Sequence, residues 1–264
     1  MTGTALTAVL ADLEAESAQL DALVAPLDHH GWHTDTPAEG WDVKHQVAHL
    51  TWTDEVAVAA MTDKKAWDAV VVEALEDPDG FVDKEANRAA RLPHRVLLAR
   101  WRAARAELAA SLLAQPEGTK ISWFGPPMSA TSMATARFME TWAHARDVAE
   151  ALGVQLPQDD RVRHVAHLGV RTRDFSFANA GRDTPTEQFR VELVLPSGEP
   201  LAWGPEGAAQ KVTGPAHDFA LLVTQRAHRA DTALHATGPD ADDWLDLAQA
   251  FAGPSGNGRE PKRA

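Results

Sequence analysis

The chain has 264 residues, of which 44% are hydrophobic and 24% charged, as expected for a soluble globular protein of one large domain or two ordinary ones. Its formal net charge is −13, and Lys and Arg cluster only in the last few residues, so neither a nucleic acid nor an anionic membrane is an expected partner. The chain has no cysteine, which excludes disulfides, a thiolate nucleophile and cysteine-based metal sites.

The first half of the chain is expected to form a helical bundle. Apolar residues recur at helical spacing, Asp42 is suited to an N-cap, and Pro93 is suited to the first turn of a helix. The predicted helices cover residues 4–28, 43–61, 63–75, 93–115 and 132–153. The four long ones predict a four-helix bundle over residues 1–153, a fold that builds metal sites from inward-facing side chains.

The second half has a different pattern. Residues 154–252 are expected to form a small α+β domain, because short runs of alternating polarity are interspersed with helical segments. The predicted strands cover residues 188–195, 200–203, 211–214 and 233–238, with helices at 215–227 and 241–251. The polar, Gly- and Pro-rich segment 253–264 is expected to be disordered.

No membrane span is expected, because no run approaches the roughly 18 apolar residues that one needs. The N-terminal segment is acidic and leads directly into a helical pattern, which is not typical of a targeting peptide. We therefore expect a cytoplasmic protein.

The helix over 132–153 carries an ionic stripe. Arg137, Glu140, His144 and Asp147 follow one another at spacings of three, four and three, which places them on one face. Glu140 and His144 are one turn apart, so both side chains can reach a single metal ion. The alternative is an internal ion pair on a solvated face, with Arg137 paired to Glu140.

Two other histidine pairs have ligand-like spacing. His45 and His49, in HQVAH, have the spacing of the zinc-protease motif, but the general-base position holds Gln46, so a peptidase is disfavoured. Their i, i+4 spacing still allows both to bind one ion. His164 and His167 lack an acidic residue at matching spacing, and we expect them to be structural.

The segments GWDVKHQVAHL and RFMETWAHARDVAEALG resemble the two metal-binding segments of the DinB-like superfamily, specifically its mycothiol-dependent maleylpyruvate isomerase branch. The C-terminal run DDWLDLAQAFAG resembles a subgroup described only as metal-binding. The resemblance implies metal ligands at His49, Glu140 and His144. It also implies a DinB-type four-helix bundle followed by a small, sterol-carrier-like α+β domain. His45 has no clear counterpart in that family, so we expect it at most to support a ligand from behind rather than to bind the metal.

Two imidazoles and one carboxylate leave open positions on an ion, as in catalytic rather than structural zinc sites. Zinc is the first choice, but iron, nickel or manganese accept the same donors. A metal there could lower the pKa of a bound thiol or water. Because the chain has no cysteine, it fits a branch in which mycothiol, a low-molecular-weight thiol, is the nucleophile.

Further residues are candidates around such a site. Arg137 is a candidate partner for a substrate carboxylate, with an ordinary salt bridge as its alternative, and Arg226 is the nearest match to an arginine that the resemblance places in the site. Asp147 is either an acceptor behind an imidazole or a solvated surface residue. Three tryptophans flank the proposed ligands in sequence and either wall a dry pocket or fill the core: Trp41, Trp52 and Trp142.

Two classes of function follow. The first is a metalloenzyme that uses an external thiol to isomerise a small electrophile or to transfer the thiol to it. The second is a bundle that binds a metal or small ligand without turnover, as a sensor, carrier or partner module. A three-ligand site serves both.

Overall fold

The computed structural model describes residues 2–253, 255–256 and 258–262. The chain divides into two compact units, Met1–Leu156 and Pro157–Ala264, which we call the bundle unit and the C-terminal unit. The helices of the bundle unit are α1 (Thr2–Val24), α2 (His29–Trp32), α3 (Val43–Thr62), α4 (Lys64–Glu76), α5 (Phe81–Ala90), α6 (His94–Leu113) and α7 (Ala130–Ala151).

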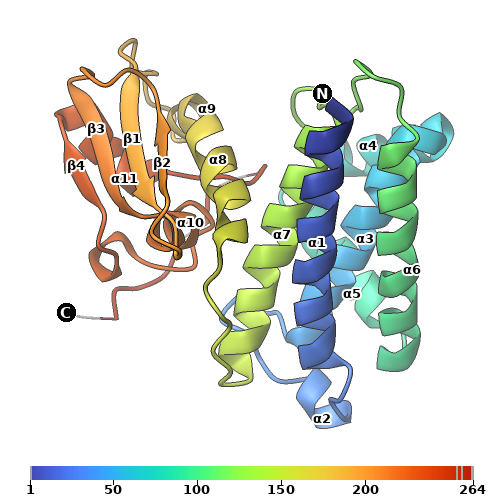
Figure 1. Cartoon of the computed structure of the whole chain (residues 1–264). Coiled ribbons are helices and arrows are strands. Elements are labelled where there is room, and N and C mark those ends of the chain that lie inside the picture. The colour runs from blue at the N-terminus through green and yellow to red at the C-terminus, as the bar shows by residue number, and fades with distance from the viewer. Residues whose placement is uncertain (1, 254, 257, 263–264) are drawn as a thin grey trace. The chain divides into compact units, whose positions relative to one another are not determined.

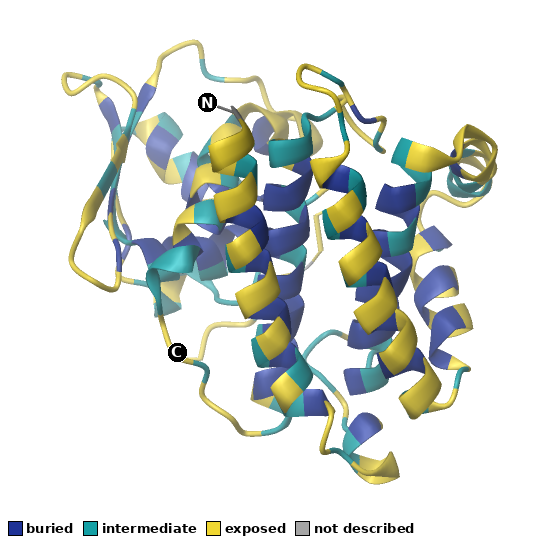
Figure 2. Cartoon of the chain, turned by 45° about the vertical axis from the view of Figure 1, so that its right-hand side comes forward, coloured by how far each residue is buried: buried dark blue, intermediate teal, exposed yellow. Residues whose placement is uncertain are grey.

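Four long helices, α1, α3, α6 and α7, lie side by side in the bundle unit (Figure 1). Helix α1 packs against α7, and α3 packs against both α6 and α7. Helices α1 and α6 turn an apolar face inward and an exposed face outward, whereas α3 and α7 are buried or half-buried over almost their whole length (Figure 2). The bundle unit's largest wholly buried side chains are Trp32, Trp101, Phe138 and Trp142. The predicted four-helix bundle is confirmed.

Two segments of the bundle unit differ from the sequence prediction. Helix α5 was not predicted; it begins after Gly80, which offers no capping side chain. The first helix was predicted to continue to residue 28, but α1 ends at Val24 and a short helix, α2, begins at His29. The Asp28 carboxylate accepts a hydrogen bond from Gly31 N (2.9 Å) and so provides the new N-cap.

The C-terminal unit is a small α+β fold, as predicted. Its helices are a 3₁₀ turn (Asp160–Val162), α8 (Arg163–Arg171), α9 (Arg173–Asn179), α10 (Ala216–Val223), a second 3₁₀ turn (Arg229–Asp231) and α11 (Pro239–Leu247). Its strands are β1 (Phe189–Val194), β2 (Pro200–Trp203), β3 (Gln210–Pro215) and β4 (His235–Thr237), in the spatial order β2-β1-β3-β4. The central strands β1 and β3 are parallel, with Val191 opposite Val212, and both outer strands are antiparallel to their neighbours.

The segment 253–264 was predicted to be disordered, and its residues 254, 257 and 263–264 lie outside the described residues. The described part contains no helix or strand, but it contacts the C-terminal unit. Ser255 Oγ donates to Gln249 Oε1 (2.6 Å), and Lys262 N donates to Asp231 Oδ2 (2.8 Å). Within the described ranges, none of the helices has both the length and the apolar character needed to cross a bilayer.

Candidate metal centre

Helices α3 and α7 supply all three predicted ligands, and each helix has a defined start. The Asp42 carboxylate caps α3 by accepting a hydrogen bond from His45 N (3.0 Å). Ser129 Oγ caps α7 by accepting from Ser132 N (3.1 Å). These caps fix where each helix begins.

A buried row of polar contacts joins α3 to α7, and we call it the α3–α7 seam. Its pairs are Gln46 with His144, His49 with Glu140, and Thr53 and Asp54 with Arg137. Seven residues forward along α3 correspond to seven residues backward along α7. This is the register of two antiparallel helices with equal rise, and it keeps the proposed ligands of the two helices opposite one another.

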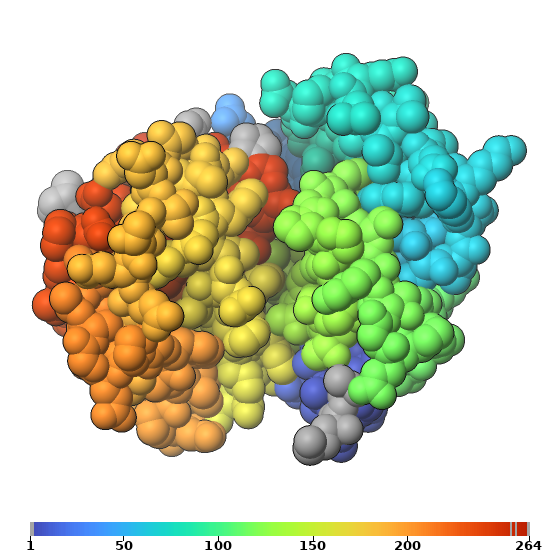
Figure 3. Space-filling model, turned by 90° about the horizontal axis from the view of Figure 1, so that it is seen from above, coloured from blue at the N-terminus to red at the C-terminus, as the bar shows by residue number. Residues whose placement is uncertain are grey.

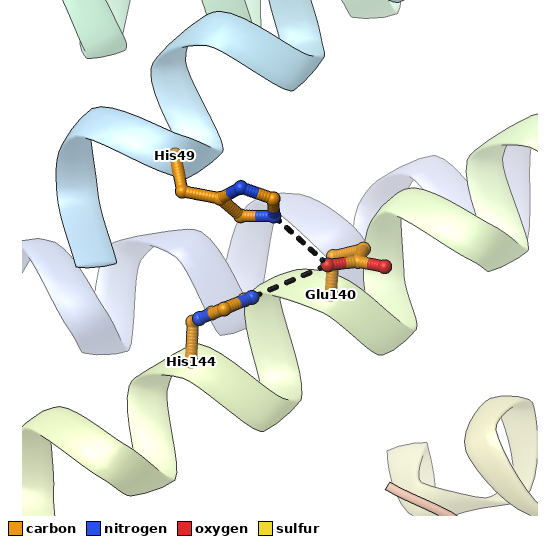
Figure 4. Close-up of side chains that lie close together, drawn as sticks. All are labelled: His49, Glu140 and His144. Carbon is orange, nitrogen blue, oxygen red and sulfur yellow. Dashed lines mark hydrogen bonds and ion pairs between the residues drawn. The ribbon is translucent and has the colours of Figure 1, made fainter. Parts of the chain in front are cut away.

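The proposed ligands converge on one point (Figure 4). The Nε2 atoms of His49 and His144 each lie 3.3 Å from the same atom, Glu140 Oε2. Two ligands bound at about 2.1 Å to one tetrahedral ion lie roughly 3.4 Å apart, so the observed spacing fits one shared ion. All three residues offer ligand atoms within 4.8 Å of one another, and no other such group occurs among the residues that the structure describes.

The charge state of Glu140 suits a ligand. Burial alone would raise the pKa of its carboxyl, but hydrogen bonds from His144 and His49, and their charge, hold that pKa well below the ordinary value. The carboxyl is therefore ionised at neutral pH. Its side chain is 20% exposed, against 10% and 11% for the two histidines, so solvent reaches the cluster on the Glu140 side.

Two of the three flanking tryptophans lie beside the ligands. The ring of Trp41 is centred 5.3 Å from that of His49 and 6.0 Å from that of His144, while Trp52 lies 6.1 Å from His49. Trp41 is held in place by a hydrogen bond from its Nε1 to Asp83 Oδ1 of α5 (2.8 Å).

Trp142 does not join the other two tryptophans. It follows Glu140 by two residues, which is about 200° around the helix, and its ring lies under the Arg146 guanidinium, 3.6 Å from its carbon. Arg146 in turn donates to Glu16 of α1 (2.7 Å). Trp142 is therefore a core residue on the α1 side of α7.

A series of aromatic rings continues from Trp52 to the α6–α7 loop. The ring centroids are 5.2 Å apart for Trp52 and Phe81, 6.1 Å for Phe81 and Phe124, and 5.1 Å for Phe124 and Trp67. The loop is closed by a β-bridge between residues 121 and 128. Seen from above, this loop (green) lies against the α4 region (cyan) (Figure 3). The apolar surroundings of His49 thus extend to two elements that are remote in sequence.

Arg137 is not placed as its predicted substrate-binding role requires. Its side chain is 2% exposed, and it donates to Asp54 Oδ1 from Nε (2.9 Å) and to Thr53 Oγ1 from Nη2 (2.5 Å). A guanidinium buried against a carboxylate is not available to an incoming substrate, so the structure assigns Arg137 a structural role. The salt-bridge alternative had paired Arg137 with Glu140, but its ionic partner in the structure is Asp54.

Two of the remaining candidates, His45 and Asp147, belong to the bundle unit. His45 bonds to Asp42 and, through Nε2, to Asn87 Oδ1 (3.2 Å), so it braces the start of α3 rather than a ligand. Asp147 is 1% exposed and is therefore not a surface residue; its role behind an imidazole stays a prediction.

The other two candidates belong to the C-terminal unit. Arg226 Nη1 donates to Thr224 O (2.5 Å), and its role in the site stays a prediction. His167 of α8 contacts the Trp203 ring, with centroids 6.4 Å apart, and burial lowers its pKa, helped by Arg171 and His164.

Sequence reasoning missed one residue of this centre. Gln46 had been interpreted only as the residue that rules out a zinc protease, yet its Oε1 faces His144 Nδ1. The available signal was its position one turn before His49, which puts both on the same face of α3.

A four-helix bundle with a His–Glu–His cluster between two of its helices defines a DinB-like protein. The sequence matches the mycothiol maleylpyruvate isomerase N-terminal domain over residues 13–149, and the chain belongs to this family. Two uncharacterised proteins of Mycobacterium tuberculosis, from strains CDC 1551 / Oshkosh and ATCC 25618 / H37Rv, are each 53% identical to it over 250 residues, 95% of this chain and 97% of theirs.

Solved structures show the same fold. The crystal structure of the mycothiol-dependent maleylpyruvate isomerase matches with a TM-score of 0.61 at 16% identity, covering 89% of this chain and 95% of that one. A mutant of that enzyme matches with a TM-score of 0.60 and the same identity and coverage. At this identity the likeness concerns the fold alone, and it confirms the predicted order of a helical bundle and a small α+β unit.

Proposed function

We propose that the protein is a divalent-metal-dependent enzyme that uses an external low-molecular-weight thiol, of the mycothiol type, to isomerise a small electrophile or to transfer the thiol to it. The observation that carries the proposal is the convergence of two imidazole Nε2 atoms on one Glu140 oxygen, at equal distances of 3.3 Å. Membership of the mycothiol maleylpyruvate isomerase family supports the thiol, because the name of that family specifies mycothiol.

In this proposal the chain's own residues hold and shield the reacting groups. His49, Glu140 and His144 would bind the ion with three protein atoms and leave positions for an external ligand on the solvent-exposed Glu140 side. When bound, the ion would lower the pKa of a coordinated thiol or water and polarise a carbonyl. Trp41 and Trp52 would exclude water from the His49 side.

Two finer parts of the proposal are which metal ion is bound and which positively charged side chain binds the substrate. Zinc is our first choice, because nitrogen and carboxylate donors at this spacing suit a tetrahedral ion, but nickel, iron and manganese accept the same donors. With Arg137 committed to Asp54, Arg226 remains the candidate for contacting an anionic substrate.

Metal analysis combined with thiol-dependent turnover tests this function. We expect purified protein to retain about one divalent ion per chain and to convert an electrophile, from a panel that includes maleylpyruvate, only when mycothiol or a mimic is added. Cobalt-substituted protein should change its visible spectrum on addition of the thiol. Bound metal with an unchanged spectrum and no thiol-dependent turnover would favour a non-catalytic carrier or sensor, and would overturn the enzyme.

A further inference from the structure

Gln46 is a buried residue behind one of the two histidines of the proposed site, His144. It is wholly buried on α3, and its side chain is bonded at both ends. Its Oε1 contacts His144 Nδ1 across the α3–α7 seam, and its Nε2 lies 2.8 Å from Thr36 Oγ1. Thr36 Oγ1 lies 2.7 Å from the main-chain oxygen of Trp41.

The direction of every hydrogen bond in this row follows from its far end. A main-chain carbonyl can only accept, so Trp41 O accepts the hydroxyl proton of Thr36. The Thr36 oxygen then accepts from an N–H of Gln46, which places the amide nitrogen of Gln46 on the Thr36 side. The amide oxygen therefore faces His144, and an oxygen that can only accept requires a proton on Nδ1.

We propose that Gln46 is a positioning residue that holds a proton of His144 on Nδ1, so that Nε2 is the nitrogen that binds a metal. Nε2 lies 3.3 Å from Glu140 Oε2, and an ion bound between these two atoms would replace the hydrogen bond that joins them. The purpose of this arrangement rests on the proposed function, but the proton on Nδ1 follows from the hydrogen bonds alone. A histidine held in this way needs no rearrangement before it binds a metal.

The other histidine has no such partner. His49 Nδ1 is buried, and it has no hydrogen-bond partner among the described residues. The two imidazoles are therefore unequal: His144 is preset by the row that starts at Trp41, while the tautomer of His49 is set by whatever binds at its Nε2.

The acceptor behind His144 is an amide rather than a carboxylate, so it adds no charge. Glu140 then supplies the only ligand charge, and a divalent ion at the site would keep a net charge of +1. A positive site suits an anionic external ligand such as a thiolate.

The matched variants are Gln46→Met and Thr51→Val. Methionine keeps the length of the side chain but cannot accept from Nδ1, whereas Thr51 is equally buried on α3 and its hydroxyl bonds only within the helix, to Val47 O (2.7 Å). The tautomer of His144 is read from the ¹⁵N shifts of histidine-labelled, metal-free protein well above the ordinary histidine pKa of about 6.5, with His144→Ala identifying the signal. Zinc affinity is measured by chelator competition.

We expect wild type and Thr51→Val to show His144 protonated on Nδ1 and to bind zinc equally. Gln46→Met should lose the single tautomer, and its zinc affinity should fall about 10- to 100-fold. An unchanged tautomer and an affinity within about threefold of wild type would overturn the inference. If that variant does not fold, Thr36→Val decides in the same way, because it breaks the row while leaving Gln46 in place. Wild type that shows the expected tautomer but binds no zinc would overturn the metal site and leave the tautomer assignment standing.

Discussion

Arg137 donates through Nε to Asp54 Oδ1 at 2.9 Å, and both side chains are almost wholly buried, with exposures of 2% and 5%. Burial raises the pKa of Asp54, although the charge and hydrogen bond of Arg137 oppose that rise. The pair lies one helical turn from Glu140 on α7. It therefore fixes the register of α3 against α7 next to the proposed ligands.

Removing Arg137 should destabilise the bundle unit strongly. Arg137→Ala leaves the Asp54 carboxylate buried without its partner, and breaking such a pair costs about 3–5 kcal/mol. Arg100→Ala is the matched control, because Arg100 also pairs with a carboxylate of α3, Glu55, but its side chain is 48% exposed. The control should lose no more than about 1 kcal/mol. Urea unfolding followed by circular dichroism measures both, and equal stability of the two variants would contradict the assigned structural role.

The metal content of single variants tests the proposed ligands. His49→Ala, Glu140→Ala and His144→Ala should each lower the bound metal, because each removes one of the three converging donors. His164→Ala is the control and should retain the wild-type content. The measurement is elemental analysis after dialysis against a weak chelator. The same metal content in wild type and all three ligand variants would refute the site.

The start of α3 should make stability depend on pH. Asp42 accepts from His33 Nδ1 (2.7 Å) and His45 Nδ1 (2.6 Å). Burial alone would raise its pKa, but these bonds and the one from His45 N lower it to about 2. Because its unfolded pKa is about 3.9, Asp42 stabilises the fold above that pH, and the contribution is lost as pH falls toward 2.

His45 acts in the opposite direction. The hydrogen bond to Asp42 raises the pKa of His45, so its contribution is complete below the unfolded value of about 6.5 and is lost as pH rises through the folded one. Asp42→Ala should cost about 1–2 kcal/mol near pH 5 and flatten both limbs of the profile. Asp63→Ala removes the cap of α4, a bond to Ala66 N (3.0 Å), and should leave the limb above pH ~6.5 unchanged. The midpoints of urea unfolding, measured across pH, give the pH dependence of stability. The same pH dependence in wild type and in Asp42→Ala would contradict the roles assigned to Asp42 and His45.

The long helices were predictable because their burial is periodic and their caps are local. Asp42 was identified as a cap from sequence, and α3 begins directly after it. Helix α5 was missed because Gly80 gives no capping signal, yet α5 carries Asp83 and Asn87, which hold Trp41 and His45. Those contacts join residues 42 positions apart, a distance that local patterns do not reach.

The grouping of His49, Glu140 and His144 was predictable for a different reason. Glu140 and His144 show their shared face through i, i+4 spacing, and the resemblance supplied His49. The partners of Arg137 and His144 were not predictable in this way. Asp54 and Gln46 lie 83 and 98 residues from them, and only the antiparallel register of α3 and α7 brings each pair together.

A glycine in the C-terminal unit should be irreplaceable. Gly204 has φ +76°, and a Cβ there would lie 2.0 Å from Phe189 O, a backbone atom that cannot turn away. Gly204→Ala should therefore destabilise the sheet by more than about 2 kcal/mol. Gly207→Ala is the control, since its Cβ would meet no atom within 4 Å. Thermal unfolding compares the two, and equal melting temperatures would contradict the expected strain.

His49 and Glu140 are separated by 91 residues of chain but face each other across α3 and α7. An ion bound between them would act as a crosslink that closes a long loop, and the unfolded chain could not form it at comparable cost. Occupancy of the site would then be visible as folding stability: free metal at about 100 times its dissociation constant would add roughly 2.7 kcal/mol. Metal supply would thereby set how long the folded chain survives proteolysis, independently of any reaction.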